Sequence, residues 1–87
     1  MSVEVQLTYA MAKELGARRL EVDGAQTVAD VLRMTRERFG GMPTRYDELT
    51  RVAAVAVNGV LIHYKRGEKT PVRDGDTVAF VKAAAGG

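Results

Sequence analysis

Cysteine and tryptophan are absent from this 87-residue sequence, and only three tyrosines and two phenylalanines are present. Without cysteine the chain can form neither a disulfide framework nor a thiolate zinc site. So few aromatic residues cannot build the stacking platform with which proteins bind single-stranded nucleic acid. The net charge of +2 is small, and the sequence has no block of about five like charges. We therefore expect no nucleic-acid partner.

Long hydrophobic runs are missing as well. No stretch approaches the roughly 18 consecutive apolar residues of a membrane-spanning helix. Residues 1–4 lack the charged segment and apolar run with which an export signal begins. We expect no membrane partner and a cytoplasmic location, which the absence of cysteine also fits. A chain of 87 residues is long enough for one small domain.

The first part of the chain alternates apolar and polar residues, as half-buried strands do. Residues 3–7 form the first expected strand, and residues 18–22 form the second, which is followed by an Asp-Gly turn at 23–24. Residues 9–15 connect the two strands, with room for a helical turn that Gly16 would close.

Residues 28–39 show the periodicity of an amphipathic helix. Thr27 can cap its first turn, and Asp30 occupies the position of the acidic partner in a capping box. The expected buried face consists of Val28, Val31, Leu32, Thr35 and Phe39. Glycines at 40–41 end the helix. A short turn of helix is expected near residues 46–49.

The second half of the chain resembles a series of short strands. Residues 52–57 are six consecutive apolar residues, which predicts a strand buried on both faces. The Asn-Gly pair at 58–59 is a strong hairpin signal, with residues 60–62 as the partner strand. The Asp-Gly-Asp sequence at 74–76 predicts a second turn.

The last expected strand, residues 77–81, is apolar on both faces. Val78 and Phe80 point to one side, whereas Ala79 and Val81 point to the other. This pattern favours a central position in the sheet. Because one helix covers only one face, Ala79 and Val81 are expected to lie outside the helix-covered core, where an apolar face indicates an interface.

Together these elements follow the order strand, strand, helix, strand, strand, strand. A mixed sheet of four to five strands packed on one main helix buries these faces economically. The sequence therefore predicts an α+β protein with a β-grasp, or ubiquitin-like, fold. We expect a single domain over residues 1–82 and a flexible C-terminal tail over residues 83–87.

The sequence ends in Gly86-Gly87, after three alanines. Glycine loses the most entropy on ordering and buries no side chain, so the pair has little structural use. A terminal carboxylate on such a thin tail can enter a narrow channel into another protein's active site. The alternative is a frayed end or a remnant of an expression tag.

Three motifs resemble the MoaD/ThiS family of ubiquitin-like sulfur carriers, and among its members most of all the small subunit of molybdopterin synthase. They are Val55-Ala56-Val57-Asn58-Gly59, Asp74-Gly75-Asp76-Thr77-Val78-Ala79-Phe80 and the terminal Gly86-Gly87. A weaker fourth match is the connector at residues 9–15. The resemblance spans nearly the whole chain.

This resemblance implies that an E1-like adenylating enzyme uses ATP to activate Gly87, which then becomes a thiocarboxylate. The sulfur would pass to an acceptor enzyme such as the large subunit of molybdopterin synthase. The chain itself would bind no cofactor and no metal and would not be an enzyme alone. The residues expected to enter partner active sites are Ala84, Ala85, Gly86 and Gly87. The residues expected at the partner interface are Tyr9, Leu61 and Val81.

Two departures from the family pattern leave the pathway open. Lys82 and Ala83 stand where small subunits of molybdopterin synthase often have prolines, and residues 38–51 are long for a carrier of the thiamine pathway. Carriers for cysteine synthesis, thiamine synthesis or tRNA thiolation remain alternatives. A ubiquitin-like protein modifier or a non-covalent adaptor remains a further one.

Other residues with chemical potential have simpler interpretations. His63 is the only histidine, and neither a cysteine nor a serine in a nucleophile elbow accompanies it. Asp74 and Asp76 flank a glycine, which is the usual composition of a turn. We therefore expect neither a catalytic histidine nor a metal pair.

Overall fold

A computed structural model describes residues 2–82 of the chain, apart from the side chain of Pro43. The predictions for residues 83–87, including a flexible tail, lie outside the described residues. The strands are β1 (Ser2–Gln6), β2 (Arg19–Asp23), β3 (Ala53–Val57), β4 (Val60–Leu61) and β5 (Thr77–Lys82). The helices are α1 (Tyr9–Leu15), α2 (Val28–Arg38) and α3 (Pro43–Arg51), with two 3₁₀ turns, η1 (Ile62–Tyr64) and η2 (Gly67–Lys69).

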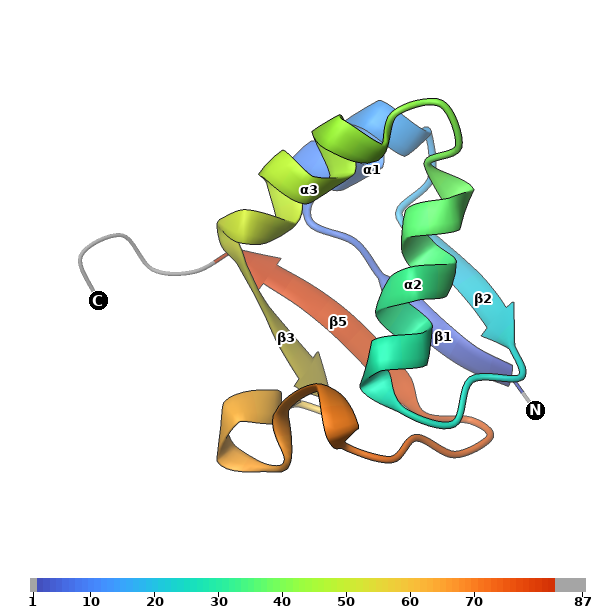
Figure 1. Ribbon diagram of the computed structural model, residues 1–87, viewed down its shortest axis with the longest axis vertical. Helices are drawn as coiled ribbons and strands as arrows, with labels where there is room; N and C mark the ends of the chain where they lie inside the picture. The colour runs from blue at the N-terminus through green and yellow to red at the C-terminus, as the bar shows by residue number, and fades with distance from the viewer. Residues whose placement is uncertain (1, 83–87) are drawn as a thin grey trace.

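The five strands form one mixed sheet in the order β2-β1-β5-β3-β4. β1 and β5 run parallel, and all other neighbouring pairs are antiparallel (Figure 1). The predicted central position of the last strand is confirmed, because β5 lies between β1 and β3. The α+β class and the mixed sheet are confirmed as well.

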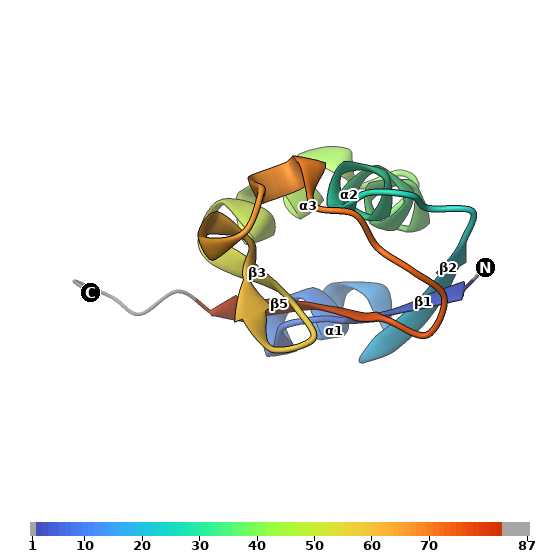
Figure 2. The same ribbon diagram turned by 90° about the horizontal axis from the view of Figure 1, so that it is seen from below.

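The helices α2 and α3 and the 3₁₀ turns lie over one face of this sheet, as the view in Figure 2 shows. No helix of residues 2–82 covers the opposite face. The prediction of one main helix was therefore incomplete, because α3 shares the covered face with α2. This layering separates an inner sheet face, which packs on the helices, from an outer one.

The start of α2 follows the capping signals in the sequence. The backbone N–H of Asp30 donates to Thr27 Oγ1 at 3.4 Å, and Asp30 Oδ2 accepts from the backbone N–H of Thr27 at 3.2 Å. These two bonds complete a capping box. The Thr35 hydroxyl donates to the Val31 carbonyl at 2.7 Å, which satisfies a polar group in the buried helix face.

Leu32 departs from the predicted face of α2. The other four residues of that face are buried, but Leu32 is only half-buried. It packs against the core and borders a groove of about 560 Å³ between α2, α3 and β3. The prediction that Leu32 is buried in the core was wrong, because α3 does not close over it.

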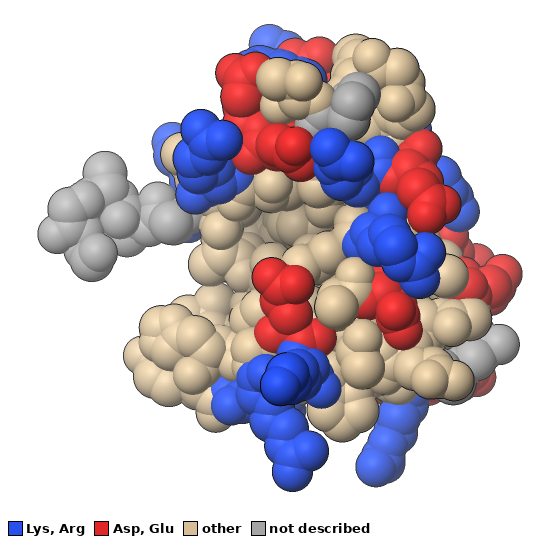
Figure 3. Space-filling model, viewed as in Figure 1, with Lys and Arg blue, Asp and Glu red and all other residues tan. Residues whose placement is uncertain are grey.

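This α2–α3 groove has an apolar floor that includes Leu32, Val55 and Ile62. Its rim is charged, and Arg36 Nε and Nη2 donate to the two carboxylate oxygens of Asp47 at 3.0 and 3.1 Å. Figure 3 shows the groove as a hollow bordered by charged side chains. Each end of the Arg36–Asp47 pair is about half exposed, so the pair adds little stability.

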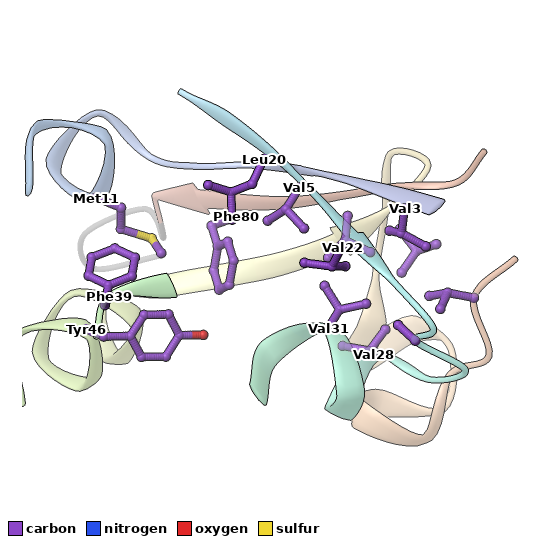
Figure 4. Packing of buried hydrophobic residues seen from close by; sticks show 14 of the residues in the cluster. Val3, Val5, Met11, Leu20, Val22, Val28, Val31, Phe39, Tyr46 and Phe80 are labelled. Carbon is purple, nitrogen blue, oxygen red and sulfur yellow. The ribbon is translucent and has the colours of Figure 1, made fainter. Parts of the chain in front are cut away.

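Buried side chains between the inner sheet face and the helices form one core (Figure 4). Met11, Phe39, Tyr46 and Phe80 gather at one end, and valines fill the other. The ring of Tyr46 lies edge-on to Phe39 and to Phe80, with centroid distances of 5.1 and 6.3 Å. Such pairs stabilise beyond the area that they bury, so α3 is fixed onto the sheet through Tyr46.

Two helices are longer than the sequence predicted. The connector after β1 is a full helix, α1, whose Thr8 Oγ1 accepts from the Met11 N–H at 3.2 Å. Gly16, with φ of +82°, ends it, which is the left-handed cap that glycine favours. The expected turn near residues 46–49 is the middle of the nine-residue helix α3.

The run at residues 52–57 does not form a strand buried on both faces, and this prediction was wrong. Val52 caps the end of α3 and is 63% exposed, and β3 begins at Ala53. Only the last two residues of the strand are buried. The partner strand is also shorter than predicted, because Ile62 begins the turn η1.

The predicted hairpin at Asn58-Gly59 is confirmed. Both residues have positive φ, +48° and +86°, as a tight hairpin turn with two left-handed residues requires. Asn58 Nδ2 donates to Asp76 Oδ1 at 3.0 Å, and Asn58 Oδ1 accepts from the Thr77 N–H at 2.9 Å. Asp76 Oδ2 also accepts from the backbone N–H of Arg73 at 2.8 Å. The two turns predicted at 58–59 and 74–76 are thus linked through one carboxylate.

This linkage predicts that the protein loses stability in acid. The hydrogen bond from Asn58 and then that from the Arg73 backbone lower the pKa of Asp76 below its usual value. A group with a lowered folded-state pKa stabilises the fold above its unfolded pKa of about 3.9, and this stability is lost as the pH falls. We expect the melting temperature to fall below about pH 4. The Asp76→Ala variant should melt lower at pH 7 and lose less on acidification.

A matched control is Asp23→Ala, because Asp23 is an exposed strand-end aspartate without a side-chain hydrogen bond among the described residues. Thermal melts from about pH 3 to pH 7 would compare the two variants, because this range includes the ordinary pKa of an aspartate carboxyl. The pKa values of Asp30 and Asp47 are also lowered, by hydrogen bonds from the Gln26 backbone and from Arg36, so part of the acid loss should remain in Asp76→Ala. Equal acid sensitivity in wild type and Asp76→Ala would contradict the assignment.

Candidate functional site

The side chains of β5 alternate between the core and the opposite sheet face, as predicted from the sequence. Val78 and Phe80 are buried against the helices, whereas Ala79 is half-buried and Val81 is 40% exposed. Val81 therefore lies outside the core, as the alternation in the sequence predicted. The strand alternation puts its side chain on the sheet face opposite that of Val78 and Phe80.

A strip of small apolar side chains crosses this outer sheet face. The strand register pairs Val81 with Ala54, Ala79 with Ala56, and Ala56 with Leu61. We call these five residues the outer apolar strip. Two of the three predicted interface residues, Leu61 and Val81, thus lie on one face. On β1, the next strand, this face becomes polar. Gln6 of β1 lies beside Ala79.

The third predicted interface residue, Tyr9, lies at the end of the sheet. β1 ends at Gln6, so the strand alternation does not extend to Tyr9, which is the first residue of α1 and is 72% exposed. Lys13 Nζ lies 5.7 Å from the centroid of its ring. Tyr9 is therefore an exposed aromatic residue, and the Lys13 ammonium lies close enough to its ring for a cation–π contact.

Tyr9 borders a hollow of about 320 Å³ where α1, α3 and the end of β5 meet. We call it the tail-root hollow, because Lys82, the last described residue, also lines it. The complete lining is Thr8, Tyr9, Ala10, Leu49, Val52, Ala53, Phe80 and Lys82. Neither the hollow nor its exposed rim residue Val52 was predicted from the sequence. Val52 ends a helix instead of beginning a strand. A sequence signal for the end of that helix would have identified Val52 as exposed.

Residues Ala84, Ala85, Gly86 and Gly87 lie outside the described residues, so their roles stay predictions. The structure shows where the chain approaches them. Lys82 is the last residue of β5 and pairs with Ala53 of β3. The tail therefore begins at one end of the central strand, beside the tail-root hollow and the outer apolar strip.

Other polar groups have structural roles. Asp74 Oδ1 accepts from the Ser2 backbone N–H at 2.6 Å, as a turn residue does. The exposed His63 ring lies against Tyr64 with centroids 4.3 Å apart. Burial raises the pKa of Tyr46 to about 12, and its hydroxyl donates to the Leu32 carbonyl at 3.1 Å. Tyr46 is thus a neutral structural hydrogen-bond donor at physiological pH.

Within residues 2–82, no cluster of three or more histidines, cysteines or carboxylates is arranged to hold a metal ion. None of the helices in the same part of the chain is long and apolar enough to cross a membrane.

The family model of the ThiS family matches residues 7–87. A protein of Archaeoglobus fulgidus, described as a proposed sulfur carrier protein, is 31% identical over the full length of both chains. The chain therefore belongs to the ThiS family of ubiquitin-like sulfur carrier proteins, and the resemblance drawn from its motifs is confirmed.

Solved structures confirm the β-grasp fold. CysO of Amycolatopsis orientalis, solved in complex with BexX, superposes with a TM-score of 0.76 at 28% identity, covering 98% of this chain and 99% of CysO. Small archaeal modifier protein 1 of Haloferax volcanii has a TM-score of 0.77 at 25% identity, with full coverage of both chains.

Subunit 1 of the molybdopterin-converting factor of Helicobacter pylori, solved with subunit 2, shares the fold. Its TM-score is 0.67 at 23% identity, with full coverage of both chains. Proteins that share this fold are therefore named in different ways, as CysO, as a small archaeal modifier protein and as a subunit of the molybdopterin-converting factor.

Proposed function

We propose that this protein carries sulfur as a thiocarboxylate on Gly87. The observation that supports it best is the family match, which extends through the terminal glycines to residue 87. The absence of cysteine from the whole sequence adds a chemical reason. No side-chain thiol can hold the sulfur, so the terminal carboxyl is the remaining attachment point.

The proposed chemistry begins with activation by an E1-like adenylating enzyme. At neutral pH the α-carboxyl, whose ordinary pKa is about 3.3–3.7, is an anion and a poor electrophile. A carboxylate oxygen of Gly87 attacks the α-phosphorus of ATP, pyrophosphate leaves, and an acyl-adenylate forms. Hydrosulfide then attacks the acyl carbon, AMP leaves with one of the two carboxylate oxygens, and the thiocarboxylate remains after loss of a proton. Neither step requires an oxidant or a reductant.

The terminal glycines suit this chemistry sterically. A Cβ atom beside the reacting carbonyl would occupy space needed by the channel wall and by the attacking sulfur. Three alanines keep the preceding segment slim as well. The chain supplies no acid, base or metal in this proposal, and its contribution is to present the carboxyl at a high effective concentration.

For the acceptor we propose the large subunit of molybdopterin synthase, in a cytoplasmic pathway of molybdenum cofactor synthesis. The motif at residues 74–80 and the connector at 9–15 support this choice. A second candidate is a sulfur carrier for cysteine synthesis, which the 28% identity to CysO favours. The likeness to small archaeal modifier protein 1 favours a modifier that ends in an isopeptide bond.

The test is ATP–pyrophosphate exchange by an adenylating enzyme of the same genome, measured with and without this protein. Exchange that depends on the protein supports carboxyl activation, and no exchange would contradict it. With sulfide present, each acceptor is then offered the product. Sulfur transfer to the molybdopterin acceptor supports the first pathway, whereas lysine conjugates in place of a thiocarboxylate would establish the modifier.

The outer apolar strip predicts a separable binding defect. Val81→Asp should weaken acceptor binding about tenfold or more, because it places a charge in an apolar contact. The fold should be retained, since Val81 is 40% exposed and outside the core. Calorimetric titration and a thermal melt measure the two effects.

The matched control is Val60→Asp, which makes the same change at a valine that is 45% exposed. Val60 lies in β4, at the sheet edge away from β5. Binding should change less than about twofold in this control. If Val81→Asp unfolds the protein, Val81 is a core residue and the outer-face assignment is wrong.

A further inference from the structure

The tail-root hollow is apolar and has a fixed shape. Leu49, Ala53 and Phe80 form part of its lining and also belong to the core or pack against it. The walls come from α1 and α3, which Arg45 joins by donating from Nε to Glu14 Oε1 at 2.9 Å. Its volume of about 320 Å³ is at the lower end of the range for ligand sites. That volume fits one large side chain.

Exposed apolar side chains concentrate around this hollow. Six large hydrophobic residues are exposed within the described part of the chain, and three of them, Tyr9, Val52 and Val81, lie at this end of the sheet. Tyr9 and Val52 line the hollow itself. Exposed apolar groups that gather around a concave site mark an interaction surface.

The surroundings of Tyr9 are positively charged. Tyr9 also lines two further hollows, and their linings include Lys13, Arg18 and Arg19. None of these three cations has an ion-pair partner among residues 2–82, and Lys82 at the rim also lacks one there.

Two acids on α1 and α3 beside the hollow are already engaged. Glu14 pairs with Arg45 at 2.9 Å, and Glu48 lies 3.8 Å from the same arginine. This part of the surface therefore presents unpaired positive charge. An acidic partner surface complements it, since charge complementarity steers association and selects partners.

The length of the remaining chain limits where a partner can bind. Five residues follow Lys82, and they span at most about 17 Å. An enzyme that receives the Gly87 carboxyl through a channel must bring its channel mouth within that distance of Lys82. A standard interface of about 800 Å² per partner has a radius of about 16 Å, so the tail-root hollow lies within reach of such an enzyme.

We propose that the tail-root hollow seats one leucine- or phenylalanine-sized side chain of the adenylating enzyme, flanked there by carboxylates. This inference rests on the proposed activation of Gly87. The apolar side chain fills the hollow between Tyr9 and Val52. The flanking carboxylates face Lys13, Arg18 and Arg19. Binding at the root of the tail thus holds the carboxyl at the nucleotide site.

The test measures the dissociation constant between the adenylating enzyme of the same genome and variants of the full chain. Ala10→Phe fills the tail-root hollow from α1, and its control Ala29→Phe fills the α2–α3 groove from α2; both alanines are exposed. We expect Ala10→Phe to raise the dissociation constant about tenfold or more. Ala29→Phe should change it less than about twofold.

A second pair of variants tests the charge. Arg18→Glu with Arg19→Glu should weaken binding and flatten its dependence on salt. The control Arg66→Glu with Lys69→Glu makes the same change in net charge on exposed residues of the opposite end of the sheet. Equal effects of both double variants would mean that only net charge matters, and would overturn the acidic-partner inference.

The remaining outcomes are distinct. A stronger effect of Ala29→Phe would assign the binding to the α2–α3 groove and overturn the proposal. If a chain ending at Lys82 shows altered NMR shifts at Tyr9 and Val52, the hollow holds the chain's own tail, and shifts that depend on concentration indicate a second copy. Either result would also overturn it.

Failure of the inference differs from failure of the proposed function. If wild type supports pyrophosphate exchange and the hollow variants bind equally well, only the hollow has been misassigned. If wild type neither binds the enzyme nor supports exchange, the proposed activation of Gly87 fails, and the inference fails with it.

Discussion

Phe39→Ala should lower the free energy of unfolding by about 3–5 kcal/mol, the cost of truncating a buried aromatic residue. Phe39 is only 2% exposed and packs against Tyr46 with ring centroids 5.1 Å apart. Truncation would leave a cavity at the end of the core where α2, α3 and the sheet meet. Urea denaturation measures the loss.

Leu32→Ala is the comparison that makes this result specific. Leu32 lies in α2, the helix that Phe39 caps, but it borders the α2–α3 groove and is half-buried, so we expect a cost of about 1–2 kcal/mol. Equal costs for the two variants would mean that the buried face of α2 is assigned wrongly. Because a domain of this size has limited stability, Phe39→Leu provides a milder variant if Phe39→Ala does not fold.

Deletion of Gly87 should abolish sulfur loading while leaving the fold unchanged. The chain then ends in Gly86, which still carries a carboxylate. This carboxylate reaches about 3.3 Å less far than that of Gly87, the length of one extended residue. A displacement of about 1 Å can already cost 100-fold in rate, so activation should fall at least that far. The core consists of residues between Val3 and Phe80, so the melting temperature should stay within about 1 °C.

The measurement is the intact mass after reaction with ATP, the adenylating enzyme and sulfide. Wild type should gain the mass of one sulfur in place of one oxygen, and the deletion variant should gain nothing. Ala84→Gly is the matched control, because it changes the tail but keeps its length and its terminal glycines. A deletion variant that loads sulfur at the wild-type rate would contradict the proposed reach of the tail.

The parts of the fold that local signals determine could be predicted from the sequence. The capping pair Thr27 and Asp30 located the start of α2, and Asn58-Gly59 located the hairpin, because each depends on hydrogen bonds or φ angles of neighbouring residues. The alternation in β5 also placed Val81 outside, since a strand with one covered face leaves its other side chains on the opposite face.

The parts that depend on packing could not be predicted. Residues 52–57 are uniformly apolar, and periodicity alone cannot show that α3 ends at Val52 and leaves it exposed. Leu32 fits the apolar stripe of α2, but its burial depends on the distance between α2 and α3. The tail-root hollow involves residues from three separate stretches of the chain, 8–10, 49–53 and 80–82, which only the folded chain brings together.

The central claim is that the terminal carboxyl of Gly87 carries the sulfur. It is tested most directly by fragmentation mass spectrometry of wild type after reaction with ATP, the adenylating enzyme and sulfide. The account predicts that sulfur replaces oxygen in every fragment that contains Gly87 and in no fragment that lacks it. Sulfur on a fragment without Gly87, or an unchanged Gly87 in a chain that has gained sulfur, would contradict the account.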